Sequence, residues 1–293
     1  MPDFLKNVYL LSAVSSVTFG VIGAFVVARR IGYLTGAISH CAFGGVGIGL
    51  WLRQLFTKGA CGTLALVSLF APEGAAKDVC KKIGESIDPV TSALIFAVLA
   101  ALLVDWIRRH AKEREETLLG AIWAIGMAVG LLFIEKVSGN SSSVSTYLFG
   151  EILLVSSRDV WFAAIFGALI VGTVFFNFKK LEAVCFDEEY ALLRGVNVGR
   201  QNRLLLVLTA ISVVLMLRLV GMAMVVALLT LPAATASRFT KRLSSMIVVS
   251  ILVCFVGSWL GVWLSVRLDC STGPVIILVV AVFYAISLPI KRR

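Results

Sequence analysis

Nine apolar stretches constrain this chain most, because all but one are close to the length of a membrane-crossing helix. Such a helix needs about 20 apolar residues to cross about 30 Å of hydrocarbon, and lipid forces it to satisfy its own backbone hydrogen bonds. Hydrophobic residues make up 59% of the chain and charged residues only 15%, unlike an average soluble domain. The sequence predicts an all-α, polytopic transmembrane helix bundle of about eight or nine spans. The candidate spans are 7–28, 34–52, 90–107, 118–136, 159–177, 204–217, 219–236, 244–266 and 274–290.

The sixth and seventh candidate spans are irregular. Residues 204–236 are too many for one ordinary span and few for two, so one of these helices is expected to be broken, tilted or incompletely crossing. The first apolar segment lacks the small-residue cleavage site of a removable signal peptide and is predicted to be retained. Residues 1–293 are therefore interpreted as a single transmembrane domain.

The distribution of Lys and Arg predicts the orientation, because cytoplasmic loops are enriched in them. With the N-terminus outside, the larger share of the 27 Lys and Arg residues falls on the inner side. An odd number of spans then places the C-terminus in the cytoplasm and makes residues 53–88 an extracytoplasmic loop. The net charge of +10 follows from this topology and from anionic lipid, without nucleic acid.

A charged break over residues 178–203 interrupts the apolar pattern on the predicted inner side. Within it, Phe186, Tyr190 and Leu193 recur at helical spacing. Acidic residues come at the start of this segment, Arg194 at its end, and Gly195 follows. Helices favour negative charge at the N-terminus, positive charge at the C-terminus and glycine just after the last turn. An amphipathic helix lying at the membrane surface would be a docking element for a soluble partner. The alternative is a solvated loop between spans.

The six cysteines include no CxxC pair. Cys61, Cys80 and Cys270 fall on the predicted outer side, and a disulfide between Cys61 and Cys80 would close the 53–88 loop. Cys185 falls on the predicted inner side, where thiols stay reduced. We treat Cys41, in the second span, as a packing residue.

His40 is the one histidine at predicted membrane depth, since His110 lies in a solvated, Arg-rich loop. Gly36, Gly44 and Gly47 share its helical face by spacing, which predicts space in front of the imidazole. Ionisable side chains inside membranes usually face a cavity or a partner, and neutral imidazole is a common ligand of transition metals. The alternative is a histidine that hydrogen-bonds neighbouring helices.

Pro232 is a second candidate functional residue at predicted membrane depth. Proline frees the carbonyl four residues earlier, at Leu228, and weakens the helix locally. With Thr235 nearby, this segment could form a hinge or line a path, although many membrane helices contain proline for packing alone. Glycine pairs at 32 and 36, 45 and 49, 126 and 130, and 257 and 261 have the small-xxx-small spacing of closely packed helices.

Taken in order along nearly the whole chain, these motifs resemble the permeases of ABC-type zinc, manganese and iron importers. The resemblance rests on the Ser-His pair ending at His40, on Tyr-Leu-Phe-Gly at 147–150, on the acidic segment at 187–191 followed by Gly195, on Val-Gly at 220–221, on Leu-Pro-Ala-Ala-Thr-Ala at 231–236 and on residues 269–274.

The resemblance implies a permease of the bacterial inner membrane that imports a divalent transition metal and has no catalytic residues or bound cofactor of its own. Its implied partners are a cytoplasmic ABC ATPase, a second permease that is identical or related, and an extracytoplasmic metal-binding protein. His40 would be a transient metal ligand, and Pro232 and Thr235 a hinge or pathway. The implied contact with the ATPase comprises Phe186, Asp187, Glu188, Glu189, Tyr190, Ala191 and Gly195. The chain contains no G-x-x-x-x-G-K-[ST] phosphate loop, so ATP would be used by the partner.

One position departs from the family pattern. Four residues before the histidine the family often has aspartate, and here the residue is Gly36. Missing ligands could come from a second permease, from Ser39, Thr35 or Cys41, or from backbone carbonyls near Pro232. Weak sites suit a transport path, because a tightly held ion would not leave. The identity of the metal is therefore left open.

Other functions fit the sequence less well. A secondary transporter driven by an ion gradient would usually carry mid-span carboxylates, whereas Asp105 and Glu135 lie near span ends. A membrane hydrolase would need a nucleophile with a base or an H-E-x-x-H motif, and neither is present. Permeases for metal chelates share the division of labour with an ATPase but are normally larger.

Overall fold

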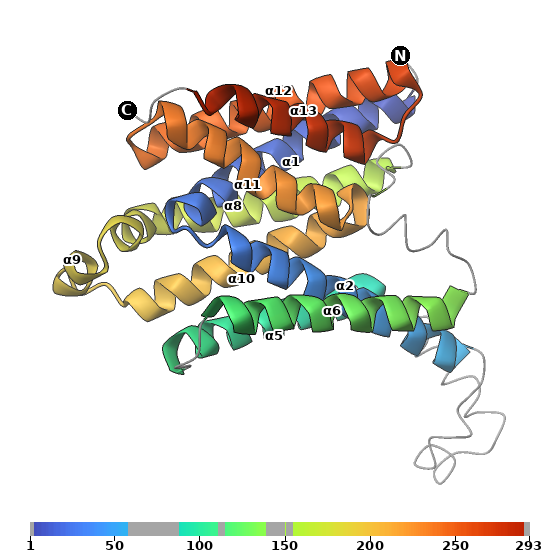
Figure 1. Cartoon of the computed structure of the whole chain (residues 1–293), viewed down its shortest axis with the longest axis horizontal. Helices are drawn as coiled ribbons and strands as arrows, with labels where there is room; N and C mark the ends of the chain where they lie inside the picture. The colour runs from blue at the N-terminus through green and yellow to red at the C-terminus, as the bar shows by residue number, and fades with distance from the viewer. Residues whose placement is uncertain (1–2, 58–87, 111–114, 139–149, 151–154, 290–293) are drawn as a thin grey trace, which may run out of the picture.

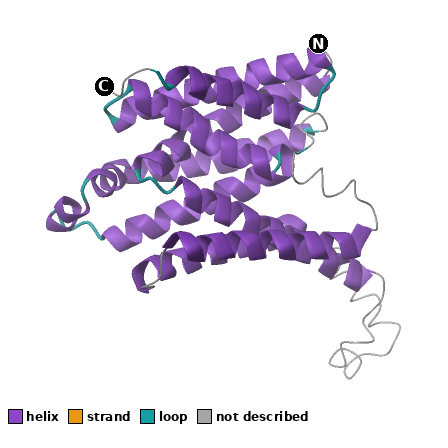
Figure 2. Cartoon of the chain, viewed as in Figure 1, coloured by secondary structure: helices purple, strands orange, loops and turns teal. Residues whose placement is uncertain are grey.

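The apolar segments form helices that run back and forth between two ends of a bundle in the computed structural model (Figure 1). The structure describes residues 3–57, 88–110, 115–138, 150 and 155–289. All regular elements in these residues are helical (Figure 2). The helices are α1 Asp3–Ala28, α2 Gly32–Thr57, α5 Pro89–His110, α6 Glu115–Ser138, α8 Ser157–Phe186, α9 Glu188–Leu193, α10 Val198–Val220, α11 Met222–Phe239, α12 Leu243–Leu268 and α13 Thr272–Ser287.

The predicted class is confirmed. Within the described residues, eight helices are long and apolar enough to cross a membrane, and the apolar helix α13 has 16 residues. The N- and C-termini lie at opposite ends of the bundle, and α9 lies at the same end as the C-terminus (Figure 1). We call this the α9 end. The predicted 53–88 loop and its cysteines, Cys61 and Cys80, lie largely outside the described residues.

Two groups of helices make up the bundle. In one, α2 packs between α5 and α6, and in the other α1 packs against α8, α11 and α12, with α13 on α12. Helix α10 contacts both groups through α5, α2 and α8. The largest fully buried side chains include Phe19 and Phe25 of α1 and Phe43 of α2. These two helices therefore form the centre of the core.

The predicted irregularity over 204–236 is a sharp bend at Gly221. Helix α10 begins at Val198, inside the charged segment, and this extension supplies the length that two helices need. Gly221 has φ 85° and ψ 155°, a conformation that essentially only glycine adopts. Its N–H donates to the Leu217 carbonyl at 3.0 Å, and its own carbonyl accepts from the Val225 N–H at 3.1 Å. One residue thus ends α10 and begins α11.

The predicted boundaries of the charged break are wrong at both ends. Residues 178–186 form the last turns of α8, which has 30 residues, and residues 198–203 form the first turns of α10. Lys179 and Lys180 are good helix formers, so nothing ends α8 where its apolar stretch ends. Helix α8 is longer than about 30 Å of hydrocarbon requires, and it carries α9 beyond the apolar part of the bundle.

Arg30 sits in the tight joint between α1 and α2 with φ 56°. This left-handed conformation costs a non-glycine residue about 1 kcal/mol. We expect Arg30→Gly to raise the stability of the protein by about 0.5–1 kcal/mol, because glycine adopts this φ without strain. The midpoint of thermal unfolding in detergent measures the change, and a lowered midpoint would contradict it.

Candidate functional site

The junction at Asp187 separates α9 from α8. Asp187 is extended, with φ −151° and ψ 108°, and its side chain accepts a hydrogen bond from the Tyr190 N–H at 3.0 Å. Asp187 therefore caps the N-terminus of α9. Glu188 and Glu189 follow in the first turn, where the helix dipole favours negative charge. The predicted acidic start of the helix is confirmed.

Gly195 ends α9, as the sequence predicts. It has φ 74°, its N–H donates to the Leu192 carbonyl at 2.9 Å, and the Val196 N–H donates to the Ala191 carbonyl at 2.9 Å. This is the Schellman arrangement, in which glycine takes the left-handed position after a helix. The helix is consequently short and has a defined end.

Helix α9 has a buried side and an exposed side. Ala191 is fully buried against Val184 of α8 and Val198 of α10. On the other side Tyr190 is exposed, and Leu193 is 89% exposed. The predicted apolar stripe is wrong in one respect, because Phe186 is the last residue of α8 and the extended Asp187 separates it from the rest. Ala191 anchors the helix, whereas Tyr190 and Leu193 present an apolar surface beyond the bundle.

Arg29, in the joint after α1, ties α9 to its neighbours. Its guanidinium donates to the carbonyl of Val184 at 2.5 Å, to Oδ1 of Asn202 at 2.5 Å and to Oε1 of Glu188 at 2.7 Å. These acceptors belong to α8, α10 and α9 in that order. The Arg29 side chain is only 9% exposed. No local sequence pattern indicates these contacts of Arg29, because its partners lie more than a hundred residues away in the chain.

Asp105 of α5 forms a second polar cluster at the α9 end. Its carboxylate pairs with Arg109 at 2.9 Å and with Arg203 of α10 at 3.2 Å. Arg109 also donates to the carbonyl of Gly199 at 2.9 Å. The first turns of α10 are therefore attached to α5 as well as to α1, and the buried carboxylate of Asp105 is accounted for by ion pairing.

His40 lies on α2 with only 8% exposure. Its ring packs against Trp123 of α6, with centroids 4.9 Å apart and planes tilted by 39°. Within the described part of the chain, its buried Nδ1 has no hydrogen-bond partner. The alternative expectation, that both ring nitrogens bond neighbouring helices, is therefore wrong for Nδ1. Among the same residues, no group of three or more His, Cys, Asp or Glu could hold a metal.

The predicted open space along the glycine face is largely filled by α6. A Cβ on Gly44 would lie 2.9 Å from the Gly126 carbonyl oxygen, and one on Gly47 would lie 2.6 Å from that of Gly130. The expectation failed because those glycines serve close helix packing. Only at Gly36 is there room, since a Cβ there would meet Trp123 at 4.0 Å, an ordinary contact distance.

Pro232 is buried within α11, and the helix continues through it. Thr235 is buried too, and its hydroxyl donates to the carbonyl of Leu231 at 2.9 Å in its own helix. One turn before the proline, the carbonyl of Leu229 lies against Gly23 of α1, so closely that a Cβ on Gly23 would overlap it. The weakened part of α11 is therefore in direct backbone contact with α1.

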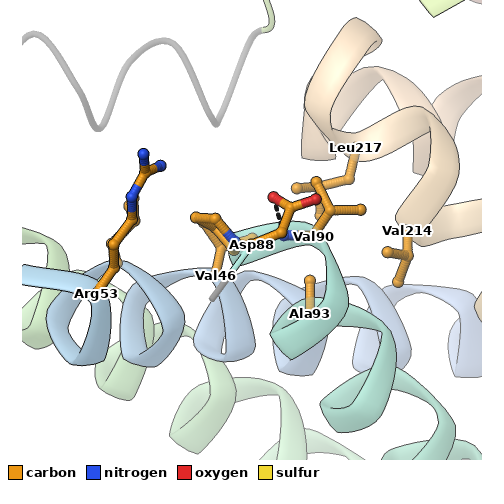
Figure 3. Close-up of a pocket in the computed structure, with 9 residues that line it drawn as sticks. Val46, Arg53, Asp88, Val90, Ala93, Val214 and Leu217 are labelled. Carbon is orange, nitrogen blue, oxygen red and sulfur yellow. Dashed lines mark hydrogen bonds between the residues drawn. The ribbon is translucent and has the colours of Figure 1, made fainter. Parts of the chain in front are cut away.

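A small cavity of about 140 Å³ lies between α2, α5 and α10 (Figure 3). Its polar residues are Arg53 of α2 and Asp88, which precedes α5 (Figure 3). The Asp88 carboxylate accepts from the Val90 N–H at 3.2 Å and so caps α5. Val46 lines the same cavity and lies six residues after His40 in α2. The cavity is therefore further along α2 than the histidine.

A family model covers nearly the entire chain. The model of the ABC 3 transport family matches residues 1–72 and 79–291. A probable metal transport system membrane protein of Chlamydia muridarum is 33% identical over 291 residues, covering 99% of this chain and 90% of that protein.

More distant relatives carry names that include a metal. The high-affinity zinc uptake system membrane protein ZnuB of Haemophilus influenzae is 24% identical, with full coverage of both chains. The manganese transport system membrane protein MntC of Listeria monocytogenes is 26% identical over 97% of this chain and 90% of its own length. Among solved structures, PsaBC from Streptococcus pneumoniae in complex with Fab matches with a TM-score of 0.78 and 27% identity, covering 98% of this chain and 92% of that one.

Proposed function

This chain belongs to the ABC 3 transport family, and on that premise we propose that it is the membrane subunit of an ATP-driven importer for a divalent transition metal ion, zinc, manganese or iron. Relatives named for zinc uptake and for manganese transport match all or nearly all of the chain, which supports metal as the cargo. In this proposal the chain itself is not an enzyme, and a separate ATPase hydrolyses ATP. The α9 end faces the cytoplasm of a bacterium, and the N-terminus faces outward.

The observation that carries the proposal is helix α9. It is capped at both ends, anchored by Ala191 and attached through Glu188, yet it exposes Tyr190 and Leu193 beyond the bundle. A helix that is held so firmly and leaves large apolar side chains in water is typical of a surface that binds a partner. We assign the cytoplasmic ATPase to this surface.

Transport then follows from a two-state equilibrium of the bundle. ATP binding brings the two ATPase subunits together and shifts α9, which favours one opening of the membrane helices over the other. A second permease, identical or related, completes the membrane part, and an extracytoplasmic protein delivers the metal at the end opposite α9. The bend at Gly221 and the weakened turn before Pro232 are the points where α10 and α11 can change their relative orientation.

His40 is the residue that we assign to the passing metal ion. A buried ring nitrogen without a partner can coordinate a metal, and a single protein ligand would release the ion readily. The free space at Gly36 adjoins Trp123. Where the family pattern would place an aspartate carboxylate, the imidazole of His40 therefore lies beside the indole ring of Trp123. Further ligands would come from the second permease, from water or from backbone carbonyls.

Metal accumulation and ATPase binding together test the proposed function. The gene is expressed, together with the genes that flank it, in a strain that lacks its own importers, and uptake of Zn²⁺, Mn²⁺ and Fe²⁺ is compared. We expect ATP-dependent accumulation of at least one ion and co-purification of an ATPase. Uptake that follows an ion gradient without any ATPase would instead indicate a secondary transporter.

We expect His40→Ala to lower the initial rate of metal uptake by about tenfold or more, because the mutation removes a ligand from the path. His110→Ala is the matched control, since His110 also stacks on a tryptophan, Trp106, but at an exposed position. Both variants should reach wild-type levels in the membrane. Equal uptake by the two variants would assign His40 to packing.

A further inference from the structure

We propose that Arg29 is the positioning residue that passes the movement of α9 to the joint between α1 and α2. The inference rests on the proposed function, because it assigns a route by which the ATPase acts on the membrane helices. No local sequence pattern and no comparison points to this residue, and the inference is carried by its contacts.

The contacts of Arg29 converge on the base of α9. One guanidinium reaches the last turn of α8, the first turn of α9 and the second turn of α10 through Val184, Glu188 and Asn202. These are the elements that enter, form and leave the predicted docking element. A planar guanidinium carries five N–H donors in a rigid fork, whereas an ammonium is a compact point charge with three rotatable donors. A displacement of α9 relative to α8 and α10 must therefore stretch or break bonds to Arg29.

The burial of the Arg29 side chain makes its hydrogen bonds costly to break. The Arg29 side chain is 9% exposed, whereas its ion-pair partner Glu188 is 52% exposed. The charge of Arg29 is compensated by the Glu188 carboxylate and by the carbonyl of Val184 at the negative end of α8. A buried charge resists separation from its partners because water cannot replace them. When α9 moves, Arg29 and the backbone around it are therefore expected to move too.

The backbone next to Arg29 is a tight joint. The Ile31 N–H donates to the Val26 carbonyl at 2.9 Å, and the Arg30 N–H donates to that of Val27 at 3.0 Å. Ile31 itself is buried, and α2 begins at the next residue. With so short and bonded a connection, a pull on Arg29 acts on the start of α2, the helix that carries His40. It also acts on α1, which contacts the weakened turn of α11 through Gly23.

The second polar cluster at this end cannot play the same part alone. Asp105 and Arg203 join α10 to α5 by an ion pair. Arg109 holds the same carboxylate from within α5, so loss of Arg203 leaves Asp105 paired. Of the three ion pairs described at this end, the one between Arg29 and Glu188 includes α9 itself.

The test uses the full complex, purified with its ATPase and reconstituted into liposomes, with Zn²⁺, Mn²⁺ and Fe²⁺ as the imported ions. Three quantities are measured, namely ATPase co-purification, the rate of ATP hydrolysis and the number of ions imported per ATP. The variants are Arg29→Gln, Arg29→Lys and Glu188→Gln. Arg30→Gln is the matched control, because it removes the same charge at the adjacent, exposed residue.

We expect Arg29→Gln to keep the ATPase bound and active but to lower the ions imported per ATP by about tenfold or more. The number of ions that Arg29→Lys imports per ATP should lie between those of Arg29→Gln and the wild type, because lysine keeps the positive charge but lacks the planar set of donors of the guanidinium. Glu188→Gln should lower the ratio in part, and combining it with Arg29→Gln should add little, because both remove one link. Arg30→Gln should match the wild type.

Other outcomes overturn the inference. An unchanged ratio in Arg29→Gln would show that α9 acts by another route, and loss of ATPase binding would show that Arg29 merely holds the docking surface. If Arg29→Gln does not fold, Arg29→Lys and Glu188→Gln decide, and wild-type ratios in both would reject the link. A wild-type complex that binds no ATPase, or imports none of the three ions, would overturn the proposed function and this inference with it.

Discussion

A permease in which Ala191 is replaced by aspartate should reach the membrane but lose ATPase binding and metal uptake almost completely. Ala191 is fully buried between Val184 and Val198, where α8, α9 and α10 meet. A carboxylate placed there is either desolvated without a partner, at a cost of about 3 kcal/mol or more, or it expels α9 from its seat. Co-purification of the ATPase from membranes and uptake by intact cells measure the effect.

Two further variants isolate the cause. Ala191→Ser changes the same position with little change in volume and should retain most uptake. Leu193→Asp adds the same charge on the exposed side of α9, where it should leave the helix seated but remove the proposed apolar contact with the ATPase. We expect weaker ATPase binding with an unchanged thermal midpoint. Full uptake by Ala191→Asp would disprove that α9 transmits anything to the bundle.

The apolar pattern was sufficient to predict the helices, because about 20 consecutive apolar residues have few alternatives in lipid. It could not predict where helices end in polar sequence. Helix α8 runs on through Lys179 and Lys180 since helix-forming residues continue past the apolar part. In contrast, the acidic first turn of α9 and the glycine after its end were predicted correctly, because both act through local backbone geometry, although Phe186 belongs to α8 and not to α9.

Side-chain environments in the candidate site were predicted less well. The spacing of Gly36, Gly44 and Gly47 correctly placed them on the face of His40, but periodicity alone does not reveal what lies opposite a face. Helix α6 fills most of that face, and only the position of Gly36 has room. The orphaned Nδ1 of His40 likewise depends on neighbours distant in sequence, and so does the set of acceptors around Arg29.

Two motifs from distant parts of the sequence meet in the structure. Gly150, with φ 71°, lies against the backbone of Val220 and Gly221, where a Cβ would overlap the Val220 carbonyl. The bend between α10 and α11 is therefore covered by a residue that also requires glycine. This contact gives a physical reason for both glycines, which sequence reasoning had treated as separate marks of a resemblance.

The contact between α1 and α11 should be the part of the bundle least tolerant of added volume, and we expect Gly23→Ala to prevent the permease from folding stably. The new Cβ would overlap the backbone oxygen of Leu229 and approach Ala233 to 3.4 Å. A backbone carbonyl cannot rotate aside as a side chain can, so the two helices must separate along a buried seam. Overpacking of this kind costs about 1–3 kcal/mol, and here it also displaces the turn before Pro232.

Gly172→Ala is the matched control, because it is the same change within an apolar helix. A Cβ at Gly172 in α8 meets nothing within 4 Å in the described structure. Since alanine is favoured over glycine in a helix by up to about 1 kcal/mol, the control should be neutral or slightly stabilising. The yield of monodisperse protein in detergent and its thermal midpoint compare the two variants. A Gly23→Ala protein as stable as Gly172→Ala would mean that α1 and α11 do not approach as closely as described. The contact could then not connect the joint at Arg29 with the weakened turn of α11.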